Sequence, residues 1–277
     1  ESAKYLIQKN INWSRKADRT AAGMLLYGPS GIGKTMIAGI ISLELSLPFV
    51  AISMADISYS EMLDAFEFAE DGAVIFLDEL QAAPRKLKDA LLVQLDPSKE
   101  SQIVAIAATT DPGNLSLPLR RRFPLEIPLN EYSVDEAAEL TLRRASALDL
   151  NIDNSTAFAI ARASRSNPAK IARLLLESQM ISDEGELNIE TLHNHLKLTG
   201  RDLRGIDQNE IEILTFLRDE ANGPAGMNKI AEVLGLDKKF VSEKLRNLRR
   251  EGLVQNMGTS GHSITNQGRL YLSDNGY

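Results

Sequence analysis

Eight consecutive residues have the types and spacing needed to hold the phosphates of a nucleotide. They fit the pattern G-x-x-x-x-G-K-[ST] and follow a short apolar run typical of a buried strand. Glycines in such a loop let backbone N–H groups turn toward the phosphates, and the helix that follows directs its positive end at them. The residues expected to bind the nucleotide are Gly28, Pro29, Ser30, Gly31, Ile32, Gly33, Lys34 and Thr35.

The last two residues of this loop have separate expected roles. Lys34 reaches the β- and γ-phosphates of a nucleoside triphosphate, and Thr35 binds the accompanying Mg²⁺. A chance Gly-rich turn is the alternative, but strand, loop and apolar helix occur here in the order that a phosphate loop requires. The sequence therefore predicts a site for a nucleoside triphosphate with Mg²⁺.

Two carboxylates stand at the end of a second apolar run, residues 74–77. We expect this strand to lie beside the strand that precedes the phosphate loop, so that Asp78 helps to bind Mg²⁺ and Glu79 polarises the attacking water. A buried strand that simply ends at an acidic turn is the alternative. The phosphate loop upstream favours catalysis.

A pair of hydroxyls and a run of arginines follow along the chain. The apolar residues 106–108 lead into Thr109 and Thr110, and Thr110 is the better candidate to contact the γ-phosphate or the water. Hydroxyl bonds local to the strand end are the alternative. The run Arg120 to Arg122 is either a solvated helix end or the source of an arginine that offsets transition-state charge in a neighbouring subunit.

These groups need a scaffold that brings strand ends together. Short apolar runs alternate with helical patterns up to about residue 130, which predicts an α/β fold with a parallel sheet and helices on both faces. Helical periodicity then continues to about residue 200 and indicates a small all-helical domain. The predicted strands are Met24–Tyr27, Phe49–Ile52, Ala73–Leu77, Ile103–Ala108 and Leu125–Ile127.

The last part of the chain follows the plan of a winged helix, with helix, turn, helix and β-hairpin in order. The basic helix before the hairpin would be the recognition helix, for which we expect contact with double-stranded DNA. A solvated helix whose C-terminal end favours cations is the alternative. The expected DNA-binding residues are Lys238, Lys239, Lys244, Arg246 and Arg249, with Arg250 on the same helix. The predicted domains are thus a P-loop ATPase domain (1–130), a helical lid (131–200) and a winged helix (201–277).

Composition narrows the classes of protein further. The chain has 277 residues, of which 43% are hydrophobic and 25% charged, as expected for a multidomain globular protein. Because it has no cysteine, disulfides, thiolate catalysis and Cys-based zinc sites are excluded. The net charge of −7 argues against coating nucleic acid by bulk attraction. No run is apolar enough to span a membrane, so we expect no membrane partner. The lack of cysteine fits a cytoplasmic protein. The chain begins with Glu1, so we expect upstream residues to be missing.

Together these elements resemble the AAA+ ATPase family, and most of the chain is similar to its RuvB branch, the bacterial Holliday-junction branch-migration motors. The segments that carry this resemblance are Ala108–Thr110, Pro118–Phe123, Tyr132–Leu176, Gly205–Asp207 and Gly223–Met227. The resemblance implies ATP and Mg²⁺ as cofactors and a homo-oligomer, a hexameric ring or spiral. It further implies double-stranded DNA and a protein adaptor as partners, and a role in DNA recombination and repair. Arg122 would be the arginine that acts on the neighbouring subunit, with Arg121 as second choice.

Three features depart from the family pattern. Asp96–Gln102 is a short connection where RuvB proteins have a long hairpin that docks their RuvA partner, which puts RuvA-type coupling in doubt. The nucleotide-sensing arginine of the lid falls on Ala169, so either Lys170 substitutes for it or the lid senses nucleotide weakly. The arginine-rich wing of the family corresponds to a segment here in which His262 is the one basic residue.

Two functions follow from these expectations. The first is a RuvB-like ATPase whose oligomer couples ATP binding and hydrolysis to translocation on, or remodelling of, double-stranded DNA. The second is an initiator- or loader-type switch, in which ATP occupancy sets a DNA-bound assembly and turnover is slow. The near-complete catalytic constellation favours the first function. The missing hairpin, the altered lid position and the basic recognition helix favour the second.

Overall fold

The computed structural model divides the chain into two compact units. The first unit runs to Ala137 and includes Ser166–Ala172, and the second comprises Ala138–Arg165 and Arg173–Tyr277. The described residues are 2–98, 101–182, 185–221 and 223–277. The predicted connection between positions 96 and 102 and the predicted turn at positions 222–226 are therefore described only in part.

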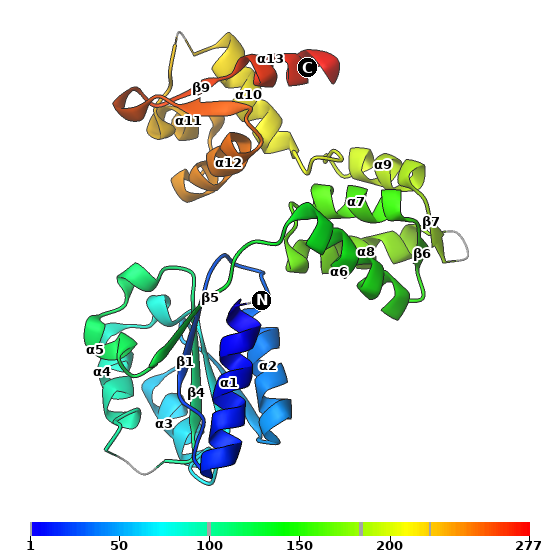
Figure 1. The fold of residues 1–277 in the computed structure, drawn as a ribbon. Helices are drawn as coiled ribbons and strands as arrows, with labels where there is room; N and C mark the ends of the chain where they lie inside the picture. Colours follow the sequence, from blue (N-terminus) through cyan, green and yellow to red (C-terminus); the bar gives the residue numbers. More distant parts are fainter. Residues whose placement is uncertain (1, 99–100, 183–184, 222) are drawn as a thin grey trace. The chain divides into compact units, whose positions relative to one another are not determined.

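A five-stranded parallel sheet forms the centre of the first unit (Figure 1). Its spatial order is β2-β3-β4-β1-β5, and every neighbouring pair is parallel. The α/β core with a parallel sheet that the alternating pattern predicts is therefore confirmed. The strands are β1 (Met24–Tyr27), β2 (Phe49–Ser53), β3 (Val74–Asp78), β4 (Val104–Thr109) and β5 (Leu125–Pro128).

The position of β3 differs from the sequence prediction. The strand that carries the carboxylates was expected beside β1, but β4 lies between them and pairs with both. Periodicity identifies strands without specifying their neighbours, because two buried parallel strands present the same apolar pattern. As a result, the two hydroxyls at the end of β4 lie between the phosphate loop and the carboxylates.

Alternate residues of the strands enter two different cores, as the two-residue period of a strand requires. Leu25 and Ile75 belong to the core shared with α3, α4 and α5, whereas Leu26 and Phe76 belong to the core shared with α1 and α2. The two groups of helices cover opposite faces of the sheet (Figure 1). These helices are α1 (Ser2–Ala17), α2 (Lys34–Leu45), α3 (Tyr59–Phe68), α4 (Arg85–Gln94) and α5 (Leu117–Arg120).

The segment after the sheet is mainly helical, as the change of period predicts. It also contains one short parallel strand pair, β6 (Asn151–Ile152) with β7 (Glu186–Leu187). Caps stabilise the helix starts: the side chain of Asp153 accepts a hydrogen bond from the backbone N–H of Thr156, and Asn188 does the same from Thr191. The helices are α6 (Val134–Ala147), α7 (Asn154–Ala163), α8 (Pro168–Ile181) and α9 (Ile189–Leu198).

The C-terminal part of the second unit is a helix-turn-helix with a β-hairpin wing. Strands β8 and β9 are antiparallel, and α13, which the sequence analysis did not predict, packs against α10. Buried aliphatic residues such as Leu214, Ile230 and Leu245 bring the three main helices around one core. The elements are α10 (Gln208–Asp219), α11 (Met227–Leu234), α12 (Lys238–Arg250), β8 (Val254–Asn256), β9 (His262–Ile264) and α13 (Asn266–Asp274).

Candidate nucleotide site and nucleic-acid interface

The phosphate loop joins β1 to α2, whose first residue is Lys34. Lys34 is only 6% exposed, and its Nζ donates hydrogen bonds to the carbonyl oxygens of Gly28, at 2.9 Å, and Pro29, at 2.8 Å. Burial lowers the pKa of Lys34, while the negative charges of Glu79 and Asp78 act in the opposite direction. The loop therefore holds its lysine close to the acidic end of β3.

Two glycines of the loop lie where a side chain does not fit. Gly28 has a φ of 152°, and a Cβ there would lie 2.2 Å from the carbonyl oxygen of Leu129. Gly31 has a φ of 76°, and its Cβ would lie 2.6 Å from Oδ1 of Asn167. Positive φ and close approach both favour glycine. The loop is thus enclosed by the chain that follows β5 and by the start of α8.

The carboxylate of Asp78, the last residue of β3, reaches the loop across the end of β4. The hydroxyl of Thr35 lies 3.4 Å from Oδ2 of Asp78, and Oδ1 of Asp78 accepts a hydrogen bond from the backbone N–H of Glu79 at 2.9 Å. A hydroxyl and a carboxylate are oxygen ligands of the kind that Mg²⁺ takes. The two residues predicted to bind the metal are therefore adjacent, and their chemistry fits that ion.

Glu79 and the two hydroxyls of β4 meet at Gln81, a residue that the sequence analysis missed. The amide of Gln81 donates to the carboxylate of Glu79 and to the hydroxyl of Thr110, and it accepts from the hydroxyl of Thr109. Thr109 is fully buried, whereas Thr110 is exposed at the strand end. The exposed hydroxyl is thus the one that the sequence favoured. A polar residue two positions beyond the acidic pair was the available signal.

The three arginines near α5 differ in their environments. Arg120 forms an ion pair with Glu126, and Nη2 of Arg122 donates to the carbonyl of Leu92, at 3.0 Å, and to Asp96, at 3.2 Å. Hydrogen bonds from Ser98, with the nearby charge of Arg122, lower the pKa of Asp96. Arg121 is exposed, and no ion pair to it is found among the described residues. The sequence's first choice, Arg122, is therefore engaged within its own chain.

The start of α8 closes over the phosphate loop. The Nδ2 of Asn167 donates a hydrogen bond to the carbonyl oxygen of Ser30 at 2.8 Å. The backbone N–H of Ala169 donates to the carbonyl oxygen of Gly31 at 3.1 Å. The Oδ1 of Asn167 also accepts from the backbone N–H of Lys170, at 3.2 Å. Sequence reasoning examined Ala169 and Lys170 but missed Asn167, because an Asn before Pro resembles an ordinary helix start.

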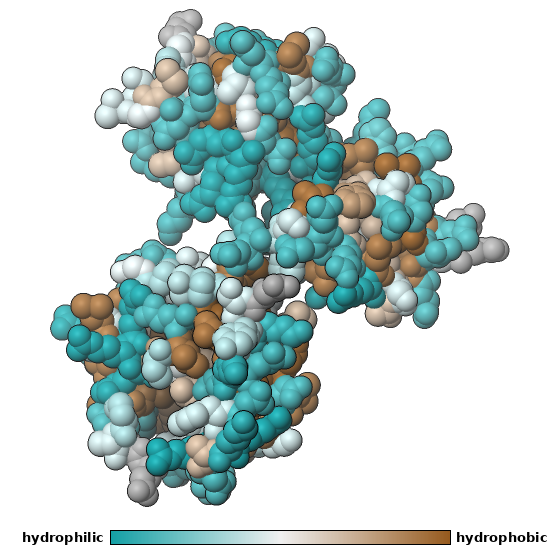
Figure 2. Space-filling model, viewed as in Figure 1, coloured by the Kyte–Doolittle hydropathy of each residue, from teal (hydrophilic) through white to brown (hydrophobic). Residues whose placement is uncertain are grey.

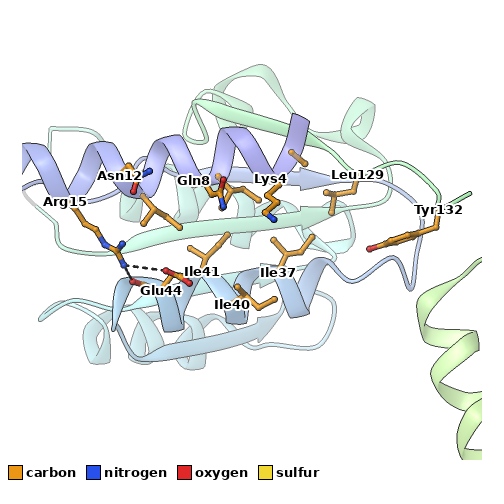
Figure 3. Close-up of a pocket in the computed structure, with 13 residues that line it drawn as sticks. Lys4, Gln8, Asn12, Arg15, Ile37, Ile40, Ile41, Glu44, Leu129 and Tyr132 are labelled. Carbon is orange, nitrogen blue, oxygen red and sulfur yellow. Dashed lines mark hydrogen bonds and ion pairs between the residues drawn. The ribbon is translucent and has the colours of Figure 1, made fainter. Parts of the chain in front are cut away.

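A groove of about 590 Å³ lies between α1 and α2 (Figure 3). Its walls are mostly aliphatic, with Ile37 and Ile41 on α2. Tyr132 lies toward the end where α2 begins, and Arg15 and Glu44 form an ion pair of 3.6 Å at the other end. The sequence analysis did not predict this groove. Its Tyr132 end is near the phosphate loop, because α2 starts there.

Most of the predicted DNA-binding residues on the basic helix α12 are exposed to solvent, and one is largely buried. Lys238, Lys239, Arg246 and Arg249 are exposed, and the surface over α12 is hydrophilic (Figure 2). Lys244 instead has a side chain only 12% exposed and forms an ion pair with Asp207. The ammonium of Lys244 is thus paired inside the module, and its contact with DNA stays a prediction.

A buried charged network holds α10, α12 and the end of α7 together. Glu210 is fully buried, and its carboxylate accepts hydrogen bonds from Arg165, at 2.9 Å, and from the amide of Asn247 on α12, at 3.2 Å. Arg165 also donates to the carbonyl of Gly205 at 2.7 Å. Buried charges need such partners, because unpaired ones are costly to desolvate. These charges maintain the fold of the second unit.

Among the described residues, no cluster of three or more His, Cys, Asp or Glu side chains is placed to hold a metal ion. No helix in the described ranges has the length and apolar character needed to cross a membrane.

Comparisons with known proteins agree with this architecture. Residues 24–131 match the model of the ATPase family associated with various cellular activities (AAA), and residues 207–256 match that of the bacterial regulatory protein, arsR family. The chain is 28% identical to the Holliday junction branch migration complex subunit RuvB of Mycoplasma genitalium, over 96% of this chain and 92% of that protein. It is 29% identical to RuvB of Kosmotoga olearia, over 86% and 79%.

Solved structures give the same result. The Thermotoga maritima RuvB Holliday junction branch migration motor superposes with a TM-score of 0.84 at 26% identity, covering 98% of this chain and 94% of that one. The parallel sheet, the phosphate loop with its acidic strand end and the AAA match define an AAA+ ATPase with a C-terminal helix-turn-helix. The similarity in sequence and structure extends over nearly the whole chain. Within the AAA+ class, this ATPase is RuvB-like.

Proposed function

We propose that this ATPase couples ATP binding and hydrolysis in an oligomer to translocation on, or remodelling of, double-stranded DNA. The observation that carries the proposal is that one chain combines a phosphate-loop site with a helix-turn-helix whose basic helix is exposed. Similarity to proteins named as Holliday junction branch migration subunits, over most of the chain, supports the same activity.

In the proposed site, the phosphate loop and Lys34 hold the phosphates of ATP. Thr35 and Asp78 would hold Mg²⁺, which supplies charge neutralisation at the phosphate oxygens. Their separation of 3.4 Å supports this assignment. Glu79 polarises the attacking water, and Thr110, the exposed hydroxyl beside it, contacts the γ-phosphate or that water.

The start of α8 gives the lid a route to the nucleotide. We propose that Asn167 and the first turn of α8 follow the position of the loop through their bonds to Ser30 and Gly31, and that Lys170 contributes charge there. The apolar end of the groove near Tyr132 and Ile37 offers a surface for the base of the nucleotide.

Completion of the site by a second subunit is also part of the proposal. An arginine from the run near α5 would act on the γ-phosphate held by a neighbouring copy in a hexameric ring or spiral. Arg122 remains the family-based choice, and Arg121 is favoured by its exposure. The names of the relatives describe a complex subunit, so a protein adaptor is a second proposed partner besides DNA.

The exposed residues of α12 are the proposed DNA contacts. They comprise Lys238, Lys239, Arg246 and Arg249, which would bind phosphates and orient the helix on the duplex. Location in the cytoplasm and action in DNA recombination and repair follow from the same proposal.

A slow ATP switch of the initiator or loader type is the second candidate. The observation that favours it is that Arg122 is bound to Leu92 and Asp96 of its own chain, which leaves it less ready to act on a neighbour. In this alternative, ATP occupancy stabilises a DNA-bound assembly and hydrolysis merely resets it.

Steady-state ATP hydrolysis with and without duplex or four-way-junction DNA tests the two candidates. A motor shows sustained hydrolysis that rises with DNA and drops about 10²- to 10⁴-fold in Glu79→Gln. A switch binds DNA with ATP but turns over slowly whether DNA is present or not.

Arg121→Ala and Arg122→Ala, mixed separately with Lys34→Ala subunits, identify the arginine that acts across the interface. Subunits that lack Lys34 supply an intact arginine but no working phosphate loop, so recovery of activity on mixing indicates action in trans. If neither arginine variant recovers activity on mixing, the proposal that the site is shared between subunits is wrong.

A further inference from the structure

The turn after β3 brings Gln81 back over the strand end. Glu79 has left-handed backbone angles, with φ of 52° and ψ of 42°, and a single 3₁₀ turn, η1 (Leu80–Ala82), follows it. A non-glycine residue with positive φ is uncommon and needs surrounding structure to hold it. The fully buried side chain of Leu80 anchors this turn in the core. The turn therefore sets both Glu79 and the residue two positions later.

The side chain of Gln81 makes three hydrogen bonds at this place. Its Nε2 donates to Oε2 of Glu79 and to the hydroxyl of Thr110, at 3.1 Å. Its Oε1 accepts from the hydroxyl of Thr109 at 2.6 Å. The orientation of the amide follows from chemistry, because an ionised carboxylate only accepts hydrogen bonds and must face the NH₂ group. The amide oxygen is then left for the buried hydroxyl.

Each partner of Gln81 is itself held in place. The Oγ1 of Thr109 accepts from the backbone N–H of Asp111 at 3.1 Å, which orients the hydroxyl toward the amide. The Nζ of Lys88, on α4, donates to the carbonyl oxygen of Gln81 at 2.9 Å. Lys88 thus holds the backbone of Gln81, and Thr109 holds its amide oxygen. The NH₂ group is directed at the carboxylate of Glu79.

We propose that Gln81 is a positioning residue for hydrolysis, which holds the carboxylate of Glu79 in register with the hydroxyl of Thr110. The inference rests on the proposed role of Glu79 in polarising water. A flexible glutamate side chain adopts many rotamers, and fixing one that faces the γ-phosphate increases the fraction of productive encounters. Gln81 also joins the ends of β3 and β4, so that the two catalytic groups move as one.

Three substitutions separate positioning from simple structural support. Gln81→Met keeps the length of the side chain and removes all three bonds. Gln81→Glu keeps the acceptor for Thr109 but removes both donors and adds a like charge. Gln81→Asn is the conservative variant and retains both kinds of group one methylene shorter. Gln102→Met, at the exposed opposite end of the β4 segment, is the matched control.

The measurements are kcat and KM for ATP hydrolysis, equilibrium ATP binding, and thermal unfolding. We expect kcat to fall about 10- to 100-fold in Gln81→Met and further in Gln81→Glu, while ATP affinity changes less than threefold. Gln81→Asn should recover part of kcat, and Gln102→Met should match the unsubstituted protein.

The outcomes distinguish this inference from the proposed function. If Glu79→Gln abolishes hydrolysis but Gln81→Met leaves kcat unchanged, the positioning role is wrong and the catalytic assignment stands. If Glu79→Gln hydrolyses ATP normally, the proposed function itself fails at this residue. A loss of ATP binding and of thermal stability in Gln81→Met in proportion to the loss of kcat would also overturn positioning, because it indicates structural support alone.

Discussion

The nucleotide site and the helix-turn-helix use charged residues in different ways. At the phosphate loop, Lys34 comes from one segment and the adjacent Asp78 and Glu79 from another, and the three converge on one location. In the second unit, charged residues of one helix have different environments. Arg246 faces solvent, whereas Lys244 is paired with Asp207 inside the module. A fixed motif around a turn predicts the position of each side chain. A cluster of charges along a helix predicts only that the helix is amphipathic.

The difference has a physical origin. The phosphate loop is constrained at every residue by backbone geometry and by close contacts, as at Gly28 and Gly31. On a helix, a shift of one residue rotates the side-chain direction by about 100°. Cations close together in the sequence can therefore differ, one facing solvent and the other facing the interior. We therefore expect the charges of the two regions to divide into a catalytic set and a structural set.

Lys34→Ala should produce the largest effect. Loss of the buried ammonium removes its contact with the phosphates, and we expect hydrolysis to fall by about 10³-fold or more with weakened ATP binding. Hydrolysis and fluorescent-nucleotide titration measure both quantities. Lys16→Ala, at an exposed position of α1, is the control and should behave like the unsubstituted protein. Normal turnover in Lys34→Ala would show that this lysine is not needed for hydrolysis at the phosphate loop.

Glu210→Ala should strongly destabilise the second unit. It leaves Arg165 buried without its carboxylate and removes a partner of Asn247, at a cost of about 3–5 kcal/mol in the free energy of unfolding. Urea unfolding followed by circular dichroism measures the loss. The double variant Arg165→Met with Glu210→Met should recover much of it, because no unpaired charge remains. Full stability in Glu210→Ala would show that the network is dispensable.

Acid should weaken the second unit through Glu177. Burial opposes ionisation there, but hydrogen bonds from Arg201, Arg173 and His195 outweigh it and lower the pKa of Glu177 to about 2. Because the folded-state pKa lies below the ordinary glutamate value of 4.5, this contribution is present above pH 4.5 and is lost as pH falls toward 2. Thermal unfolding across this range should show a loss of about 1–3 kcal/mol.

Glu177→Gln removes the titrating group and serves as the control for that measurement. Its stability should be lower at neutral pH and should vary less with pH between 4.5 and 2. Identical pH profiles for the two proteins would exclude Glu177 as the source of the acid sensitivity.

Arg246→Ala and Lys244→Ala should separate binding from folding on a single helix. Arg246→Ala should weaken duplex binding about 3- to 10-fold and reduce its dependence on salt, with unchanged stability. Lys244→Ala should lower the unfolding temperature, because Asp207 loses its partner, while DNA affinity at low temperature stays within about twofold. Fluorescence anisotropy at several salt concentrations and thermal melts measure the two effects. If Lys244→Ala weakens DNA binding and Arg246→Ala lowers the unfolding temperature, the roles given to these two residues are wrong.

Much of the architecture was predictable from local patterns. Apolar runs located all five strands of the main sheet to within one residue or so, and the basic helix expected before the hairpin is α12. The loop motif located Lys34 and Thr35 at the start of α2, and the acidic pair located Asp78 and Glu79 at the end of β3. These succeed because strand period, helix period and a glycine-rich turn are properties of adjacent residues. The roles of these residues in binding and hydrolysis stay predictions.

The amino-acid sequence alone determined that this chain binds nucleotide phosphates and carries a helix-turn-helix, because both depend on residues close together in the chain. Tertiary structure decided that β4 separates β3 from β1, that Gln81 bridges Glu79 to the threonines, and that Asn167 closes on the loop. It also decided which cations of α12 face solvent. These features depend on contacts between distant segments and on side-chain direction, and neither has a periodic signature in the sequence.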